Sequence, residues 1–199
     1  MTDLLTWAFG LASVVGLALT LYYGRKSARL ERASQTLSWE DVAVAADDLA
    51  AAIARSGFQP DLFLALSVRS GIIAHFIAKH LTPTRPVLVG IVEWKEEDLF
   101  SGDLSAYDAF DTSKVRIHIP KALYANNKCR VLLVEDFIMS GDGMAETRSR
   151  LEAHGFPSHA IRTAALIVTG IALARHRGPD HYWKKVDSLD FFFPWGRAR

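Results

Sequence analysis

The chain has 199 residues, and its 23 basic residues nearly balance its 22 acidic ones, which gives a formal net charge of +1 at pH 7. This balance gives no reason to expect a nucleic-acid partner, because such a partner selects for an excess of positive charge. The length is enough for one α/β domain and a short additional segment. The single cysteine excludes an internal disulfide and fits a reducing compartment.

The first predicted element is a membrane-spanning helix at residues 4–24, with the lipid bilayer as its partner. This stretch contains no charged residue, and a transmembrane helix needs about 20 apolar residues. Only Asp3 lies before it, whereas four basic residues follow it closely, namely Arg25, Lys26, Arg29 and Arg32. The positive-inside rule then predicts a single-pass protein with the N-terminus outside and the C-terminal domain in the cytoplasm. The alternative is a buried amphipathic helix of a helical hairpin.

Residues 25–37 are predicted to form a basic juxtamembrane linker, and residues 38–199 a folded domain. Ser38 is a good N-cap for an amphipathic helix at Trp39–Ser56, because its hydroxyl can accept a backbone N–H and acidic residues occupy the first turn.

The segment Pro60–Lys79 is predicted to form a strand, a turn and a helix. The strand is Leu62–Ser67 and the helix is Ile72–Leu81. Arg69 and Ser70 fall in the turn between them. A guanidinium beside free backbone N–H groups is suited to binding an anion.

Two further strands are predicted at Pro86–Val92 and Val115–Ile119. Between them lies Glu93–Lys114, a polar and acidic segment with little periodicity. A connection of this length is unusual unless it has a function. The alternative is a surface loop without a function.

The segment Val131–Met144 is the most informative in the chain. Its strand, Val131–Val134, ends in two adjacent carboxylates, Glu135 and Asp136, which cannot both be buried without partners and should therefore face a ligand. A tight turn follows, formed by Ser140, Gly141, Asp142 and Gly143. Because the turn leads into a helix at Met144–His154, several backbone N–H groups converge there and form an anion cradle. The pattern suits a phosphorylated ribose. The cradle would bind the phosphate, and the carboxylates would accept hydrogen bonds from the ribose hydroxyls or hold a magnesium ion.

The last predicted strands are Arg162–Val168 and Asp190–Phe193. Strands that alternate with helices indicate a doubly wound, mostly parallel α/β sheet. In such a sheet the ligand lies at the carboxyl ends of the strands, where both turns described above are predicted.

These motifs resemble those of a known family, the type I phosphoribosyltransferases. Val131–Met144 resembles the motif that binds phosphoribosyl pyrophosphate (PRPP), and Pro60–Lys79 resembles the pyrophosphate loop. Val186–Trp195 resembles the purine-site end of the xanthine/guanine branch. The matches run in the family's order from Leu37 to Trp195. The chain is therefore interpreted as a purine phosphoribosyltransferase-like domain of type I fold, preceded by one transmembrane helix.

The resemblance implies roles for individual residues. Glu135, Asp136 and Arg69 would be the catalytic residues, and Asp136 would bind Mg²⁺, the expected cofactor. The residues that would bind PRPP are Glu135, Asp136, Ser140, Gly141, Asp142, Gly143, Met144, Arg69 and Ser70. Those that would contact a nucleobase are Phe191, Phe192 and Trp195, although the aromatic run could instead belong to the core and Trp195 could close the domain. The segment after Glu93 would be a flap over the site, and a homo-oligomer is expected.

Several residues depart from the family pattern. Met139 stands where purine enzymes carry an aspartate that relays a proton, and a methionine cannot do so. Gly143 replaces a hydroxyl residue, Asp142 adds a carboxylate beside the phosphate site, and Thr169 stands near the place of a lysine that contacts the purine. Two hypotheses follow: an enzyme that joins a nucleobase to PRPP and releases pyrophosphate, or a catalytically impaired module that senses PRPP or a nucleotide at the membrane.

Overall fold

The computed structural model describes residues 16, 19–23, 35–81, 83–95, 102–187 and 189–198. No helix within these ranges is both long enough and apolar enough to cross a membrane. Most of the anchor predicted at residues 4–24 lies outside the described residues, and so do residues 25–34 of the predicted linker.

Five parallel strands form the central sheet of the domain. In spatial order they are β3 (Val87–Val89), β2 (Leu62–Ala65), β7 (Val131–Ile138), β8 (Ile161–Thr169) and β9 (His181–Val186). Strands β7 and β8 are buried along almost their whole length, as expected for parallel strands that are covered on both faces. The predicted doubly wound, parallel α/β sheet is confirmed.

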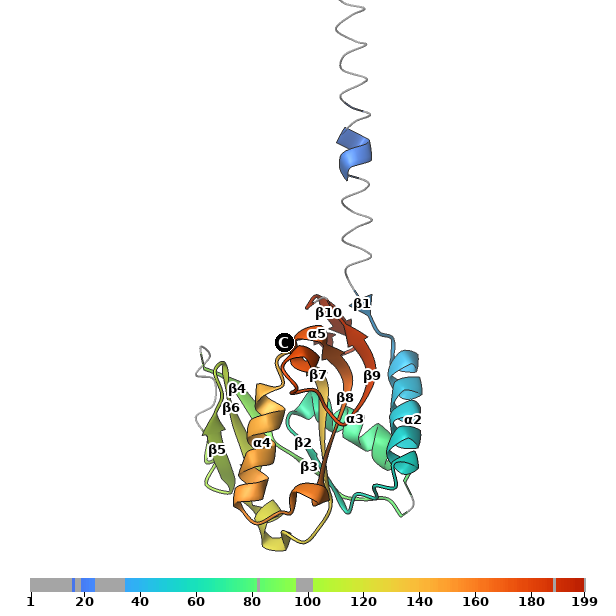
Figure 1. Cartoon of the computed structure of the whole chain (residues 1–199). Coiled ribbons are helices and arrows are strands. Elements are labelled where there is room, and N and C mark those ends of the chain that lie inside the picture. Colours follow the sequence, from blue (N-terminus) through green and yellow to red (C-terminus); the bar gives the residue numbers. More distant parts are fainter. Residues whose placement is uncertain are drawn as a thin grey trace, which may run out of the picture.

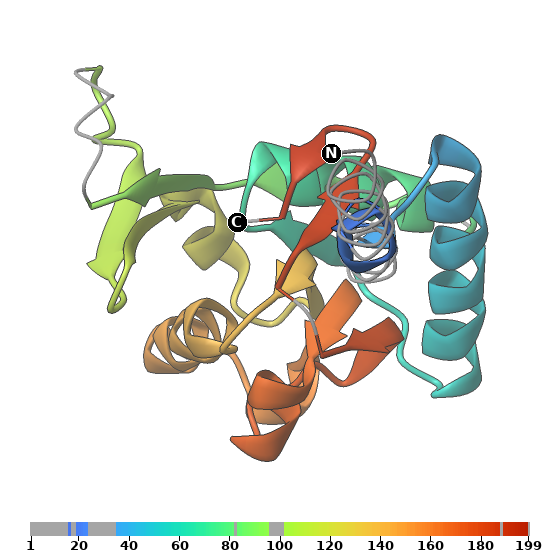
Figure 2. The same cartoon turned by 90° about the horizontal axis from the view of Figure 1, so that it is seen from above.

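Helices cover both faces of this sheet (Figures 1 and 2). Helices α2 (Trp39–Arg55) and α3 (Val68–Ala78) share one hydrophobic core with the sheet, and α4 (Asp142–Ala153) packs in the core of the opposite face. Ser38 caps α2 through a reciprocal capping box, as its position in the sequence predicts. The shorter helical elements are η1 (Lys121–Asn126), η2 (Ser158–Ala160) and α5 (Gly170–Ala174).

Two small sheets flank the central one. The first is antiparallel, with β4 (Ile91–Trp94), β6 (Val115–Pro120) and β5 (Tyr107–Asp111) in that order. The second, which we call the cover, consists of β1 (Gln35–Thr36), β10 (Phe191–Phe193) and β11 (Gly196–Arg197), together with the turn of Pro194 and Trp195 between the last two. Strand β1 runs parallel to β10 and pairs with it, so segments from before and after the central sheet meet in the cover.

The structure corrects the predicted strand at Pro86–Val92, which is two strands in two different sheets. The break is at Gly90, whose N–H donates a 2.8 Å hydrogen bond to the Ala65 carbonyl while the chain turns into β4. A Cβ at this position would lie 2.7 Å from the His118 carbonyl oxygen, so only glycine fits.

Other element boundaries also differ from the prediction. Helix α3 begins at Val68, so Arg69 lies in its first turn rather than in a separate turn. Strand β7 continues through Glu135 and Asp136 to Ile138. Strands β5 and β9 were not predicted, and β5 lies inside the segment expected to be one long connection.

Candidate functional site

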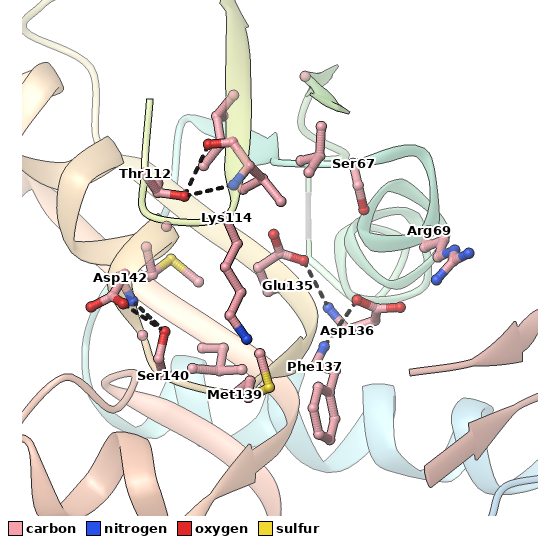
Figure 3. A pocket seen from close by; sticks show the side chains of 18 of the residues that line it. Ser67, Arg69, Thr112, Lys114, Glu135, Asp136, Phe137, Met139, Ser140 and Asp142 are labelled. Atoms are coloured by element: carbon pink, nitrogen blue, oxygen red, sulfur yellow. Dashed lines mark hydrogen bonds between the residues drawn. The ribbon is translucent and has the colours of Figure 1, made fainter. Parts of the chain in front are cut away.

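A cavity of about 410 Å³ opens at the carboxyl ends of β2 and β7 (Figure 3). One wall is the start of α3, where Ser67, Val68 and Arg69 lie, and a second wall is the β4–β6 hairpin sheet. The floor is the end of β7 and the following loop, from Glu135 to Met144. The two sequence motifs therefore meet in one cavity, because both follow strands that are neighbours in the parallel sheet.

Glu135 is held by the first turn of α3. The Ser70 hydroxyl donates a 2.5 Å hydrogen bond to Glu135 Oε2. Burial, followed by repulsion from the adjacent Asp136 carboxylate, raises the pKa of Glu135 to about 8. The Asp136 backbone N–H also donates a 3.3 Å hydrogen bond to Oε2.

Asp136 is more completely enclosed, with 7% of its surface exposed. Its Oδ1 accepts a 2.9 Å hydrogen bond from the Phe137 backbone N–H, and its Oδ2 accepts a 3.0 Å hydrogen bond from the Trp195 indole. Burial raises the pKa of Asp136, although the bond from Trp195 and the charge of Arg69 act in the opposite direction. The cover therefore engages the carboxylate that the sequence assigned to ribose and magnesium.

The start of α3 holds Arg69 at the mouth of the cavity. The Ser67 side chain caps the helix by accepting a 3.2 Å hydrogen bond from the Ser70 backbone N–H. The Arg69 guanidinium donates a 3.3 Å hydrogen bond to the Arg197 backbone carbonyl in β11. The cover thus contacts both predicted ligand-binding motifs, at Asp136 and at Arg69.

The segment from Ser140 to Gly143, which we call the phosphate loop, turns sharply into α4 and includes its first two residues, because the helix begins at Asp142 and not at Met144 as predicted. Gly141 has φ +79°, which favours glycine, and a Cβ there would collide with the Arg177 backbone carbonyl. Gly141 is the N-cap residue and supplies no side-chain acceptor. The Asp142 N–H donates a 3.4 Å hydrogen bond to the Ser140 hydroxyl, so the N–H groups of Gly143 and Met144 are the ones in the first turn of α4 that are suited to an anion.

The negative charge of Asp142 in the phosphate loop is compensated by a neighbouring arginine. Its carboxylate is paired with the Arg177 guanidinium and also accepts a 2.9 Å hydrogen bond from the Ser140 hydroxyl. The Ser140 bond and the Arg177 charge together lower the pKa of Asp142. The expected repulsion between Asp142 and a phosphate is therefore largely compensated.

Two positions that depart from the family pattern have structural reasons. A Cβ at Gly143 would lie 3.2 Å from Ile117 Cδ1, so the hairpin sheet packs closely against the phosphate loop. The Thr169 hydroxyl donates a 2.5 Å hydrogen bond to the Met139 carbonyl and caps α5. Thr169 therefore holds the loop backbone, and Met139 remains in the lining of the cavity.

The three predicted nucleobase residues are not among those that line this cavity, although Trp195 contacts Asp136, which does. Phe191 is fully buried and packs between Phe137 and Phe193, so neither face of its ring is open to a base. Trp195 stacks on Phe193 with ring centroids 5.0 Å apart while its N–H binds Asp136. Phe192, on the same short strand, is partly exposed.

Two residues of the site, Lys114 and Arg177, were not identified from the sequence, and neither was the hydrogen bond from Trp195 to Asp136. Lys114 extends from the β5–β6 turn into the cavity (Figure 3). Arg177 reaches the phosphate loop from the segment after α5, 35 residues from its partner. Neither lies in a local motif, so only the tertiary structure relates them to the site.

No group of three or more potential metal ligands occurs among the described residues. This donor set still fits magnesium, which commonly uses one or two carboxylates together with the phosphates of its substrate. Glu135 and Asp136 are the carboxylates that would hold the ion, and both oxygens of Asp136 already accept hydrogen bonds.

No protein-family model matches this sequence, and no curated protein matches it either. Solved structures do match its fold. A purine phosphoribosyltransferase from Pyrococcus horikoshii has 16% sequence identity and a TM-score of 0.55, over 84% of this chain and 97% of the other. A xanthine-guanine-hypoxanthine phosphoribosyltransferase from Helicobacter pylori has 15% identity and a TM-score of 0.54, over 82% and 93%.

A further match is a protein from Neisseria gonorrhoeae with bound ppGpp, with 18% identity and a TM-score of 0.60 over 81% of this chain and 89% of the other. At these identities the likeness establishes the fold. The described domain has the α/β fold of the type I purine phosphoribosyltransferases.

Proposed function

We propose that this chain is a phosphoribosyltransferase that transfers the phosphoribosyl group of PRPP to a nucleobase, a purine in the first instance, and releases pyrophosphate. The observation that supports it most directly is that the Glu135–Asp136 pair, the phosphate loop and Arg69 line one cavity. Acceptors for ribose hydroxyls, donors for a phosphate and a cation for a leaving pyrophosphate thereby face the same ligand volume. The fold shared with purine phosphoribosyltransferases agrees with this assignment.

The chemistry would proceed by displacement at the anomeric carbon of the ribose. A nitrogen of the base forms the new bond while the bond from carbon to the pyrophosphate oxygen breaks. Positive charge develops on the sugar, which the Glu135–Asp136 pair would stabilise in its ionised form, and negative charge develops on the leaving group, which Arg69 would stabilise. Bound Mg²⁺ would neutralise pyrophosphate oxygens. These residues act by positioning and charge, which needs no covalent intermediate.

The proposal includes attachment to a membrane through residues 4–24. The absence of charge in this stretch and the basic residues that follow it support a single span with the N-terminus outside and the domain in the cytoplasm. We also expect the domain to form a homo-oligomer, which sedimentation analysis of the detergent-solubilised chain would test.

A second function is favoured by specific observations. Met139 lines the cavity but cannot relay a proton to or from a purine, and Trp195 engages Asp136. The similarity in fold to a protein with bound ppGpp also agrees with nucleotide binding. The alternative is a module that binds PRPP or a nucleotide and passes its state to a membrane partner.

One experiment separates the two functions. The full-length chain in lipid nanodiscs would be incubated with PRPP, Mg²⁺ and guanine, xanthine, hypoxanthine or adenine, while pyrophosphate release and calorimetric binding are measured separately. The enzyme predicts release that depends on one base. Binding of PRPP or of a nucleoside monophosphate without release supports the sensor, and binding of neither contradicts both functions.

A further inference from the structure

Lys114 is a cation of the cavity that has no partner among the described residues. It lies in the turn between β5 and β6, lines the cavity and points toward the part of the site that carries Met139 and Ser140 (Figure 3). Within the described part of the chain, no acidic side chain or carbonyl pairs with its ammonium. The basic residues beside it in the same hairpin sheet, Lys95 and Arg116, both pair with Asp111.

The turn that carries Lys114 is fixed in place. The Thr112 hydroxyl donates a 2.9 Å hydrogen bond to the Val115 carbonyl and accepts a 3.1 Å hydrogen bond from the Val115 N–H. The Lys114 carbonyl also accepts a 3.2 Å hydrogen bond from the Lys95 backbone N–H. The side chain of Lys114 therefore projects from an ordered backbone.

The hairpin lies directly against the phosphate loop. Ile117 Cδ1 would be in contact with a Cβ at Gly143. Thr112 and Ser113, which precede Lys114, line a second hollow of about 400 Å³ together with Asp142 and Arg177. Lys114 thus belongs to the wall that faces the phosphate loop, on the opposite side of the cavity opening from Arg69 (Figure 3).

The carboxylate at this end of the cavity is already paired. Asp142 is neutralised by Arg177, and the loop itself offers uncharged N–H groups. A phosphate monoester carries about −1.5 to −2 charge at pH 7. Arg69 is bound to the cover at the other end of the site, which leaves Lys114 as the cation of the described cavity lining that can pair with such a phosphate.

We propose that Lys114 is a specificity-determining residue, which pairs with the 5′-phosphate of the bound ligand and makes the site prefer phosphorylated ribosides to nucleosides. This inference rests on the proposed function, because it takes Ser140–Gly143 as the phosphate end of the cavity. In this arrangement Lys114 supplies the charge, and the loop N–H groups supply the orientation of the phosphate.

The test compares ligands that differ only in the phosphate. The full-length chain in nanodiscs would be titrated by calorimetry with GMP and guanosine, and with AMP and adenosine as a second pair. Lys114→Gln should weaken nucleotide binding about tenfold or more, because it removes a charge-assisted hydrogen bond. Nucleoside binding should stay within about twofold of the wild type, and Lys114→Arg should restore most of the nucleotide affinity.

Lys121→Gln is the matched control, since Lys121 lies beyond the other end of β6 and its ammonium binds the Ser105 carbonyl at 2.8 Å. It should leave both affinities unchanged. Equal losses for nucleotide and nucleoside, or no loss at all in Lys114→Gln, would overturn the role of Lys114 while the proposed function stands. A wild-type chain that binds neither PRPP nor any of the nucleotides would overturn the proposed function, and with it this inference.

Discussion

The indole N–H of Trp195 donates a 3.0 Å hydrogen bond to the Asp136 carboxylate, although 59 residues separate the two in the sequence. One of the acceptors expected to bind ribose is therefore engaged by the cover before a ligand arrives. A ligand that needs this oxygen has to displace the indole, and the free energy of that displacement is subtracted from the affinity.

Trp195→Phe should therefore strengthen ligand binding. Phenylalanine keeps an aromatic ring against Phe193 and removes only the donor, so we expect the affinity for ribose 5-phosphate to rise about tenfold, the lower end of what a hydrogen bond to a charged group contributes. Trp183→Phe is the control, because its N–H binds Asp48 on α2 at 3.1 Å. Weaker binding in Trp195→Phe would mean that the indole holds Asp136 in its ligand-bound position instead.

The acidic pair should be needed for ligand binding whether or not the chain catalyses a reaction. Replacing Glu135 and Asp136 together with alanine removes acceptors that contribute roughly 1.5–3 kcal/mol each when charged. The calorimetric affinity for PRPP with Mg²⁺ should fall at least about tenfold. Asp47 and Asp48 are likewise neighbours in the sequence and lie on the exposed side of α2, so their double alanine variant is a matched control that should keep the affinity for PRPP. Unchanged affinity in the Glu135/Asp136 variant, with an intact circular dichroism spectrum, would place the ligand elsewhere.

The raised pKa of Glu135 predicts a pH dependence of stability. Its pKa is about 8 in the folded chain, against 4.5 for the free side chain. The folded state thus binds the proton more tightly than the unfolded state, so this contribution to stability is largest below pH 4.5 and is lost as the pH rises toward 8. The free energy of unfolding should decrease by up to about 1.4 kcal/mol per pH unit in this window.

Urea unfolding of the chain without magnesium, followed by fluorescence between about pH 5 and pH 8, would measure this slope. Glu135→Gln mimics the protonated acid and keeps an acceptor for the Ser70 hydroxyl, so its profile should be flatter than that of the wild type. Parallel profiles for the two proteins would show that Glu135 is ionised throughout this range.

Met139→Asp tests whether proton transfer limits a reaction at this site. Met139 lines the cavity, and an aspartate there would provide the acid/base group that purine enzymes carry, which typically contributes about 10²–10⁴-fold. If the chain is an enzyme limited by this step, pyrophosphate release should increase, and Met139→Asn should not reproduce the gain. Ordinary turnover by the wild type, on the order of 1–10³ s⁻¹, would show that Met139 is no handicap. If the chain is a sensor, neither variant should release pyrophosphate.

The proposed topology places residues 35–198 in the cytoplasm. In inside-out vesicles, added protease should digest this domain, and in right-side-out vesicles it should be protected. A tag before Met1 should show the opposite accessibility and serves as the internal control. Protection of the domain in inside-out vesicles would reverse the assigned orientation.

The sequence predicted the parts of this structure that are encoded locally. The strand, acidic pair and turn from Val131 to Gly143 are contiguous, so their hydrophobic pattern and turn chemistry were sufficient to identify them. The same holds for Ser38, whose capping role depends on residues three positions away.

The remaining features depend on distant segments. Strand β9 contains two lysines and a tryptophan at an edge of the sheet, so its composition lacks the apolar run of a buried strand. The pairing of Arg177 with Asp142 and the direction of Lys114 arise only when separate loops meet over the end of β7. The burial of Phe191 likewise follows from packing against Phe137, which the aromatic run by itself does not reveal.

The parallel pairing of β1 with β10 brings the chain that follows the predicted anchor next to the strand that leads to Trp195. The cover consists of strands of only two or three residues, so it should open locally at a lower free energy than the five-stranded sheet beneath it. Its amides should therefore exchange with solvent deuterium well before those of β7. A displacement of Gln35 would be transmitted to Asp136 through a few backbone hydrogen bonds and one indole ring, which couples the candidate site to the point where the chain enters the domain.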